Sequence, residues 1–329
     1  MKYLFILLSL ILLTCKTKSS APNQKTTIIF DTDANNELDD QHALAYLLFN
    51  QDHFQIEGVT VNATRSGGNM DKQYEEAERI MKLCQADSIP LLKGADSSFT
   101  AILPTIDSTD FDGKLAVDFM IKSAHRSRLD KLVLIAVGKL TNVALAVAKD
   151  STIVSKIRLV WLGSNYPEPG EYNQDNDTAA MNYLLNTRID FEMVTVRYGK
   201  PSGTDAVKIT QEEVNKKMPG LGPKIKIPVI GRHGGSFGCF GDYSVDLFKH
   251  IDYHGTPPSR ALFDMAAVAI VKNPAWAQRQ EISSPLYINN QWVERPSNPR
   301  KIKIWENFNT PAILSDFFNS FPINIESKN

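Results

Sequence analysis

The chain has 329 residues, of which 43% are hydrophobic and 22% are charged, as in an ordinary globular protein. Its 36 Lys and Arg residues against 37 Asp and Glu residues give a net charge of -1. This balance lacks the basic excess of a nucleic-acid-binding protein. Three cysteines, Cys15, Cys84 and Cys239, are too few to form a disulfide framework.

The N-terminal segment is typical of an exported protein. Lys2 precedes an apolar run, Tyr3–Leu13, that is too short to span a membrane but suits the core of a signal peptide. The run continues into Thr14-Cys15 and then a polar stretch, which resembles a bacterial lipoprotein signal. The resemblance implies a lipid anchor on Cys15, at the periplasmic membrane or the cell surface. A secretory signal cleaved nearby is the alternative.

Alternating strand and helix patterns follow. Strands are predicted where short apolar runs rich in β-branched residues occur, and helices where apolar residues recur every three or four positions. In chain order we predict a strand at 26–30, a helix through 43–48, a strand at 54–61, a helix at 71–84, a strand at 132–137, a helix at 141–148, a strand at 157–162, a helix at 178–185, a strand at 191–196, and a final strand and helix after residue 275. Residues 198–254 have no clear pattern.

This alternation predicts an α/β fold with a doubly wound, mostly parallel sheet. We expect a signal peptide at 1–14, a polar tether at 15–25 and a single domain at 26–329. Ligands of such sheets bind beyond the carboxyl ends of the strands, so the loops that follow strands are the places to look for a functional site.

The loop after the first strand is strongly acidic. Asp31, Asp33, Glu37, Asp39 and Asp40 place five carboxylates within ten residues. A solvated turn with a helix cap explains one or two of them. Five carboxylates beside an apolar strand repel one another, and a bound cation would offset this repulsion. The donors are all oxygens, which indicates Ca²⁺ or Mg²⁺ rather than zinc.

This loop resembles the motif D-x-D-P-G-x-D-D of the nucleoside hydrolase family, inosine–uridine-preferring type. Asp31, Asp33, Asp39 and Asp40 stand in its acidic positions, but a longer Ala-Asn-Asn-Glu stretch replaces Pro-Gly. An alignment with Glu37 in the third acidic position is rejected, because it would put a leucine in the fourth.

Three later motifs extend the resemblance over residues 26–275. Gly138–Asn142 matches the family's G-x-L-T-N, in which Thr141 also suits a helix N-cap. Glu171-Tyr172-Asn173, with Asp177 four residues after Asn173, matches E-F-N and its following Asp, a helix cap. Phe263-Asp264 opens a helix where the family has His-Asp.

The resemblance implies a calcium-assisted hydrolase that cleaves ribonucleosides into ribose and base. Asp33 would be the general base. The implied Ca²⁺ ligands are Asp33, Asp40, the Thr141 carbonyl and Asp264. The implied ribose-binding residues are Asp39, Asn69, Asn165, Glu171, Asn173 and Asp264. Asn62, nearer the second strand, is an alternative to Asn69.

Phe263 is the most consequential departure, because the family's His at this position helps the base to leave. His233, Tyr253, His254 and Arg260 lie upstream of it and are candidates for that role. The base preference therefore stays open.

Two other functions remain possible from the sequence. One is a lipoprotein that binds nucleosides without cleaving them. The other is a haloacid-dehalogenase-like phosphatase with Asp31 as nucleophile, because residues 241–246 mimic that family's later acidic motif. The expected partner is a small ribonucleoside, with no nucleic acid, and membrane contact only through the lipid anchor. Family analogy adds a homo-oligomer.

Overall fold

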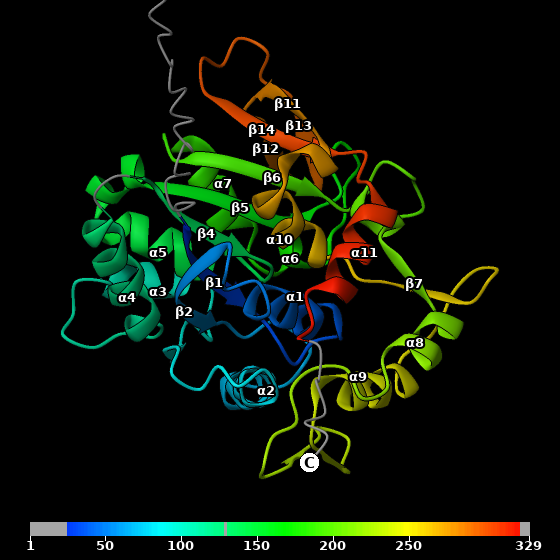
Figure 1. Ribbon diagram of the computed structural model, residues 1–329. Coiled ribbons are helices and arrows are strands. Elements are labelled where there is room, and N and C mark those ends of the chain that lie inside the picture. Colours follow the sequence, from blue (N-terminus) through cyan, green and yellow to red (C-terminus); the bar gives the residue numbers. More distant parts are fainter. Residues whose placement is uncertain (1–24, 128–129, 323–329) are drawn as a thin grey trace, which may run out of the picture.

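An eight-stranded sheet forms the centre of the computed structural model, which describes residues 25–127 and 130–322 (Figure 1). The predicted signal peptide and Cys15 lie outside these residues. The strand order is β11-β14-β6-β5-β4-β1-β2-β3. The strands are β1 (Thr26–Thr32), β2 (Phe54–Val61), β3 (Leu91–Lys93), β4 (Leu132–Ala136), β5 (Ile157–Ser164), β6 (Asp190–Thr195), β11 (Gln278–Ser283) and β14 (Lys301–Glu306). All neighbours pair in parallel except β11 and β14, which confirms the doubly wound, mostly parallel sheet.

Helices cover both faces of this sheet. One face carries α1 (Asp39–Leu48), α2 (Met70–Leu83), α9 (Phe240–Lys249), α10 (Met265–Lys272) and α11 (Thr310–Asn319), and the other carries α3 (Phe99–Ile102), α4 (Lys114–Arg126), α5 (Thr141–Lys149) and α7 (Thr178–Asn186). Successive side chains of a strand point to opposite faces. In β1, Ile28 and Phe30 therefore join one core while Ile29 joins the other.

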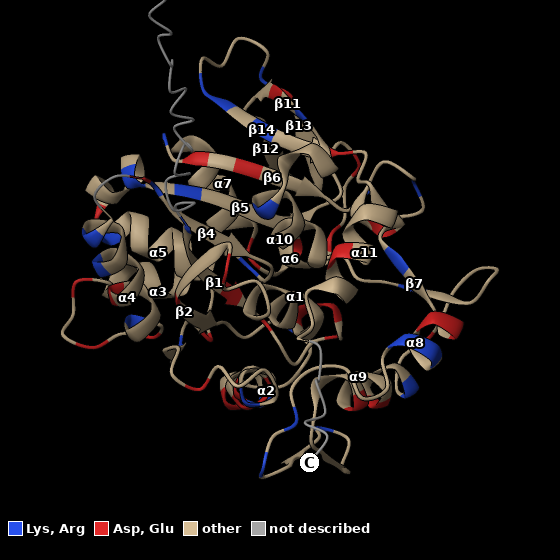
Figure 2. Ribbon diagram, in the orientation of Figure 1, with Lys and Arg blue, Asp and Glu red and all other residues tan. Residues whose placement is uncertain are grey.

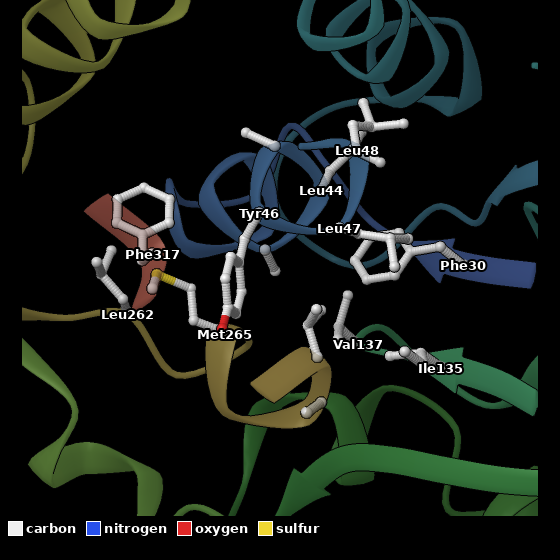
Figure 3. Packing of buried hydrophobic residues seen from close by; sticks show 14 of the residues in the cluster. Phe30, Leu44, Tyr46, Leu47, Leu48, Ile135, Val137, Leu262, Met265 and Phe317 are labelled. Atoms are coloured by element: carbon white, nitrogen blue, oxygen red, sulfur yellow. The ribbon is translucent and has the colours of Figure 1, made fainter. Parts of the chain in front are cut away.

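Helix α1 is held in the middle of the first core. All ten of its residues are buried, and it packs against α10. Figure 3 shows Tyr46 of α1 beside Met265 of α10, with Phe30 and Val137 at the neighbouring strands. A helix that is buried all round has little freedom to shift. The acidic residues at its N-terminus are thereby fixed in place.

Residues 198–263 follow β6 in the chain and include the segment 198–254 that sequence patterns left unassigned. We call residues 198–263 the outer wall. It contains β7 (Lys208–Thr210), α8 (Gln211–Lys217), β8 (Val229–Ile230), β9 (Ser236–Phe237), α9 and β10 (Ser259–Ala261), with the short 3₁₀ helix η3 (Thr204–Ala206). Strands β7 and β10 pair antiparallel, so the two ends of this long segment lie side by side (Figure 1).

The remaining elements are short. They are α6 (Tyr172–Asn176), β12 (Leu286–Ile288), β13 (Gln291–Val293), η1 (Leu103–Thr105), η2 (Ser151–Lys156) and η4 (Pro274–Trp276). Every predicted strand and helix is confirmed, with shifts of a few residues at the ends. The sequence did not predict β3, α3, α4, α6 or the elements of the outer wall, and it predicted one strand after residue 275 where the structure has four. In the described ranges, no helix combines the length and the apolar character that crossing a membrane requires.

Candidate active site

A cavity of about 340 Å³ opens at the carboxyl ends of four neighbouring strands. Asp33 after β1, Val137 after β4, Leu162 in β5 and Val196 after β6 all line it. Figure 2 shows acidic segments near β1, α1 and α6 in the interior of the molecule, where most of the ribbon is uncharged. This is the edge at which parallel sheets of this kind bind ligands, and the volume suits a small molecule.

Three carboxylates converge in this cavity. Asp39 and Asp40 begin α1, and Asp264 directly precedes α10. Each offers an oxygen that lies within 4.8 Å of the others, because α1 and α10 pack side by side. We call these residues, together with Asp33, the carboxylate cluster.

The electrostatics of the cluster favour a bound cation. Burial raises the pKa of Asp39, Asp40 and Asp264, and the charge of Asp33 raises each of them further. The charge of Asp39 also raises the pKa of Asp40 and Asp264. Carboxylates this close cannot all be ionised near neutral pH unless positive charge lies between them. Oxygen donors suit Ca²⁺ or Mg²⁺, so the donor set fits the predicted calcium ion.

Asp33 has a defined orientation. Its Oδ2 accepts a hydrogen bond from the Thr64 hydroxyl at 2.6 Å, and burial raises its pKa above the ordinary value. A methyl group on Gly138 would lie 2.9 Å from Asp33 Oδ1 and 2.8 Å from Asn62 Oδ1. Only glycine lets the loop after β4 approach this closely, which is a physical reason for glycine at the start of G-x-L-T-N.

Asp31 is buried next to the site and holds polar side chains around it by hydrogen bonds. Its carboxylate accepts hydrogen bonds from Thr60, Asn62 and Asn142 at 2.6, 3.0 and 2.8 Å. Burial raises its pKa to about 6. It does not line the cavity, so a nucleophilic role of the phosphatase kind finds no geometric support. Residues 241–246, which mimic the phosphatase motif, lie within helix α9 rather than after a buried strand.

Glu171 and Asn173 approach the cavity from the short helix α6. Glu171 caps this helix by accepting a hydrogen bond from the Gln174 backbone at 2.9 Å, and burial raises its pKa to about 8. Asn173 donates to the Val137 carbonyl at 2.6 Å. The Oδ1 of Asn173 is buried without a partner among the described residues, and such an acceptor is costly unless a ligand donates to it.

The opposite side of the cavity belongs mainly to the outer wall. Arg260 in β10 forms an ion pair with Glu37 from the lengthened acidic loop. Tyr198 and Phe263 meet edge to face with ring centroids 5.9 Å apart. These four residues and His254 all line the cavity.

Thr141 is placed differently from the sequence-based expectation. It does not line the cavity, and Leu140 rather than Thr141 occupies the N-cap position of α5. The Thr141 hydroxyl instead donates to Asp177 at 2.6 Å. Val137, four residues earlier, lines the cavity and lies next to Asn173. Its carbonyl therefore replaces that of Thr141 as the candidate metal ligand.

The structure also favours Asn62 over Asn69. Asn69 is exposed and caps α2 by accepting a hydrogen bond from the Lys72 backbone. Asn62 is fully buried between Asp31 and Gly138, and its Oδ1 has no hydrogen-bond partner within the described part of the chain. Asn69 thus has a helix-capping role. Asn62 does not line the cavity, but it lies behind it in contact with Asp31.

Asn165 connects two loops rather than lining the cavity. Its side chain donates to the Pro169 carbonyl and accepts from the Tyr198 backbone, both at 3.0 Å. It therefore positions Tyr198. Asp177 caps α7 by accepting from the Ala180 backbone, as the sequence predicted.

Two candidates for the missing histidine lie away from the cavity. His233 stacks on His250 with ring centroids 4.1 Å apart, and Tyr253 stacks on Phe248.

Ser66 and Asp205 also line the cavity, although the sequence did not predict them as site residues. Ser66 interacts with the hydroxyl of Tyr172, which also lines the cavity. No sequence motif marks Ser66 or Asp205.

Comparison with known proteins identifies the family. A family model described as inosine-uridine preferring nucleoside hydrolase matches residues 28–313. The chain belongs to this nucleoside hydrolase family. No curated protein sequence gives a significant match to the chain.

Solved structures of nucleoside hydrolases have the same fold. A plant nucleoside hydrolase has 15% sequence identity and a TM-score of 0.69, covering 90% of this chain and 99% of its own. A purine-preferring ribonucleoside hydrolase from Gardnerella vaginalis has 18% identity and a TM-score of 0.66, covering 90% and 98%. An inosine-uridine preferring enzyme from Bacillus anthracis has 15% identity and a TM-score of 0.63, again covering 90% and 98%. At these identities the likeness establishes the fold.

Proposed function

We propose that the protein hydrolyses the N-glycosidic bond of ribonucleosides with the help of Ca²⁺. The observation that carries this proposal is the carboxylate cluster in the cavity at the carboxyl edge of the sheet. The bond breaks through a sugar with cationic character, and surrounding carboxylates stabilise the positive charge that develops there. Membership of the nucleoside hydrolase family supports the same reaction.

The residues that would hold the ion are Asp33, Asp40, Asp264 and the Val137 carbonyl, with Asp39 in reach. Bound Ca²⁺ would orient a water molecule and the ribose hydroxyls, without acidifying the water strongly. A carboxylate base therefore remains necessary. Asp33 suits this role because it lines the cavity beside the three converging carboxylates and Thr64 fixes its orientation.

In the reaction, the electron pair of the bond from C1′ to the base nitrogen moves onto the base. The oxygen of water bonds to C1′ of ribose, and Asp33 accepts a proton from that water. Asp39, Asn173, Glu171 and Asp264 bind the ribose hydroxyls. The buried Oδ1 of Asn173, unpartnered among the described residues, would accept a hydrogen bond from one of these hydroxyls.

Product analysis tests the proposed reaction. Purified protein is incubated with inosine or uridine in the presence of Ca²⁺, and chromatography is used to quantify base and sugar. Equal amounts of free base and unphosphorylated ribose are expected. Nucleoside binding by calorimetry without products would instead support the non-catalytic binding role. Phosphate release from phosphate esters, with a phosphorylated Asp31, would support a phosphatase.

We also propose that the chain is exported and anchored through a lipid on Cys15. The short apolar run before that cysteine supports this proposal. In a bacterial host, wild-type protein should fractionate with membranes and incorporate labelled fatty acid. Cys15→Ser should abolish the label. Labelling that persists in Cys15→Ser would contradict the anchor.

A further inference from the structure

Arg260 is the cavity residue whose contacts point most clearly to a ligand. Strand β10 places it on the outer wall, where its side chain is only 12% exposed and pairs with Glu37. Its Nε is buried and has no hydrogen-bond partner within the described residues. A buried donor without an acceptor is unfavourable. Because Arg260 lines the cavity, a ligand that offers an acceptor there would satisfy this donor.

Glu37 helps to fix the position of Arg260. It lies in the acidic loop that is longer than the family motif, and it contacts a residue 223 positions away in sequence. An arginine has several donors in a fixed planar arrangement. With Glu37 bound to one terminal nitrogen, the orientation of the remaining donors is restricted.

The neighbouring aromatic residues suit a flat heterocycle. Tyr198 and Phe263 line the same side of the cavity and meet at an interplanar angle of 80°. Phe263 cannot donate a proton to a leaving base. The carboxylate cluster lies at the carboxyl ends of the strands. Ribose bound there would direct its base toward the outer wall.

We propose that Arg260, positioned by Glu37, activates the leaving base by donating a hydrogen bond to an acceptor on its ring. This inference rests on the proposed hydrolysis of ribonucleosides. The substrates would be nucleosides whose base carries a carbonyl oxygen or ring nitrogen at the edge that faces Arg260. Uridine and inosine have such acceptors.

The chemistry differs from protonation by a histidine. Arginine keeps its proton under ordinary conditions, so it stabilises negative charge without transferring a proton. As the bond to C1′ breaks, its electron pair moves onto the base and the acceptor becomes more negative. The hydrogen bond from Arg260 therefore strengthens toward the transition state, which is the condition for catalysis. The departed base then takes its proton from solvent water.

A pair of substrate types tests this role. Uridine and inosine have poor leaving groups, whereas the p-nitrophenolate of p-nitrophenyl β-riboside leaves readily as an anion. We expect Arg260→Gln to lower kcat for both nucleosides by about 10²-fold. For the nitrophenyl riboside the loss should be at most about 5-fold, because this leaving group needs little assistance. Retained hydrolysis of the nitrophenyl riboside also shows that the variant is folded.

Matched variants sharpen the test. The quantity to compare is the ratio of kcat for a nucleoside to kcat for the nitrophenyl riboside. Arg126 forms an ion pair with Glu57 on the surface and does not line the cavity, so Arg126→Gln should leave this ratio at the wild-type value. Glu37→Gln should lower the same ratio less than Arg260→Gln does. Arg260→Lys keeps the charge but loses the planar donors, and it should restore only part of the loss.

The outcomes separate this inference from the proposed function. Equal losses on both substrate types in Arg260→Gln, or no loss on either, would overturn the role of Arg260. A selective loss on nucleosides in His254→Ala, with no such loss in Arg260→Gln, would assign the role to His254 instead. Wild-type protein that cleaves the nitrophenyl riboside but no nucleoside would also overturn it. Wild-type protein that releases ribose from none of these substrates would refute the proposed hydrolysis itself.

Discussion

The two sides of the cavity are built in different ways. The carboxylate cluster lies at the ends of buried elements, with α1 enclosed on all sides and packed on α10. The outer wall comes from the long segment between β6 and α10, and the Glu37–Arg260 pair joins the acidic loop to strand β10 of this wall. Buried, close-packed elements hold atoms rigidly, whereas connecting segments tolerate change. If the proposed reaction holds, the hydrolytic chemistry is held on the rigid side and the outer wall contacts the base.

The largest effect should come from the rigid side. Asp33→Asn keeps the shape of the side chain but removes the base, so kcat should fall by about 10²–10⁴-fold. Ribose release from inosine measures this loss. Asp118 is a half-exposed acid on α4 that pairs with Lys114, and Asp118→Asn serves as the control with wild-type activity. Near-normal kcat in Asp33→Asn would remove Asp33 from the mechanism.

Asp264→Ala should break the cluster itself. The variant loses one of three converging oxygen donors, so both calcium affinity and turnover should fall. Titration calorimetry with Ca²⁺ measures the affinity without any need for activity, and a loss of about 10-fold or more is expected. Wild-type calcium affinity in this variant would place the ion elsewhere.

The two asparagines after β2 should differ in their effects, because Asn62 contacts buried Asp31 whereas Asn69 caps a helix. Asn62→Ala removes a hydrogen bond to buried Asp31 and should lower kcat/KM by about 10–100-fold. Asn69→Ala removes only the cap of α2 and should cost about 1 kcal/mol of stability. Kinetic assays and chemical denaturation of both variants provide the comparison. A larger kinetic loss in Asn69→Ala than in Asn62→Ala would favour Asn69 as the ribose-binding residue.

The smallest expected effect concerns stability and pH. Burial raises the pKa of Glu171 from 4.5 to about 8. In the metal-free protein, the stability gained from its protonated form is fully present below the unfolded pKa and is lost as pH rises through about 8. The Tm measured with a chelator should therefore fall between about pH 5 and pH 8. Added Ca²⁺ should reduce the fall, and a Tm that rises over this range would contradict the assignment.

Sequence patterns predicted the rigid side well, for physical reasons. Its strands are short apolar runs, and parallel strands bring the residues after each one to a common edge. Asp33, Asp39, Asp40, Glu171 and Asn173 therefore meet in the cavity as expected. Asp264 joins them because α10 packs on α1.

The departures have physical reasons too. Every residue has a backbone carbonyl, so the sequence could not show whether Val137 or Thr141 supplies the carbonyl ligand. Asn62 and Asn69 both follow β2, and only the position of Asp31 beside Asn62 distinguishes them. Glu37 and Arg260 are 223 residues apart, and the pairing of β7 with β10 that brings Arg260 into place has no motif in the sequence.

Calcium-dependent release of ribose tests the proposed hydrolysis most directly. Reducing sugar is measured from a panel of ribonucleosides with Ca²⁺, after chelation, and after Ca²⁺ is restored. We expect ribose release that is lost with the chelator, recovers with Ca²⁺ and is absent in Asp33→Asn. Ribose release that persists after chelation would contradict a calcium-assisted site. No release from any ribonucleoside, in protein that still binds Ca²⁺, would contradict the proposed reaction.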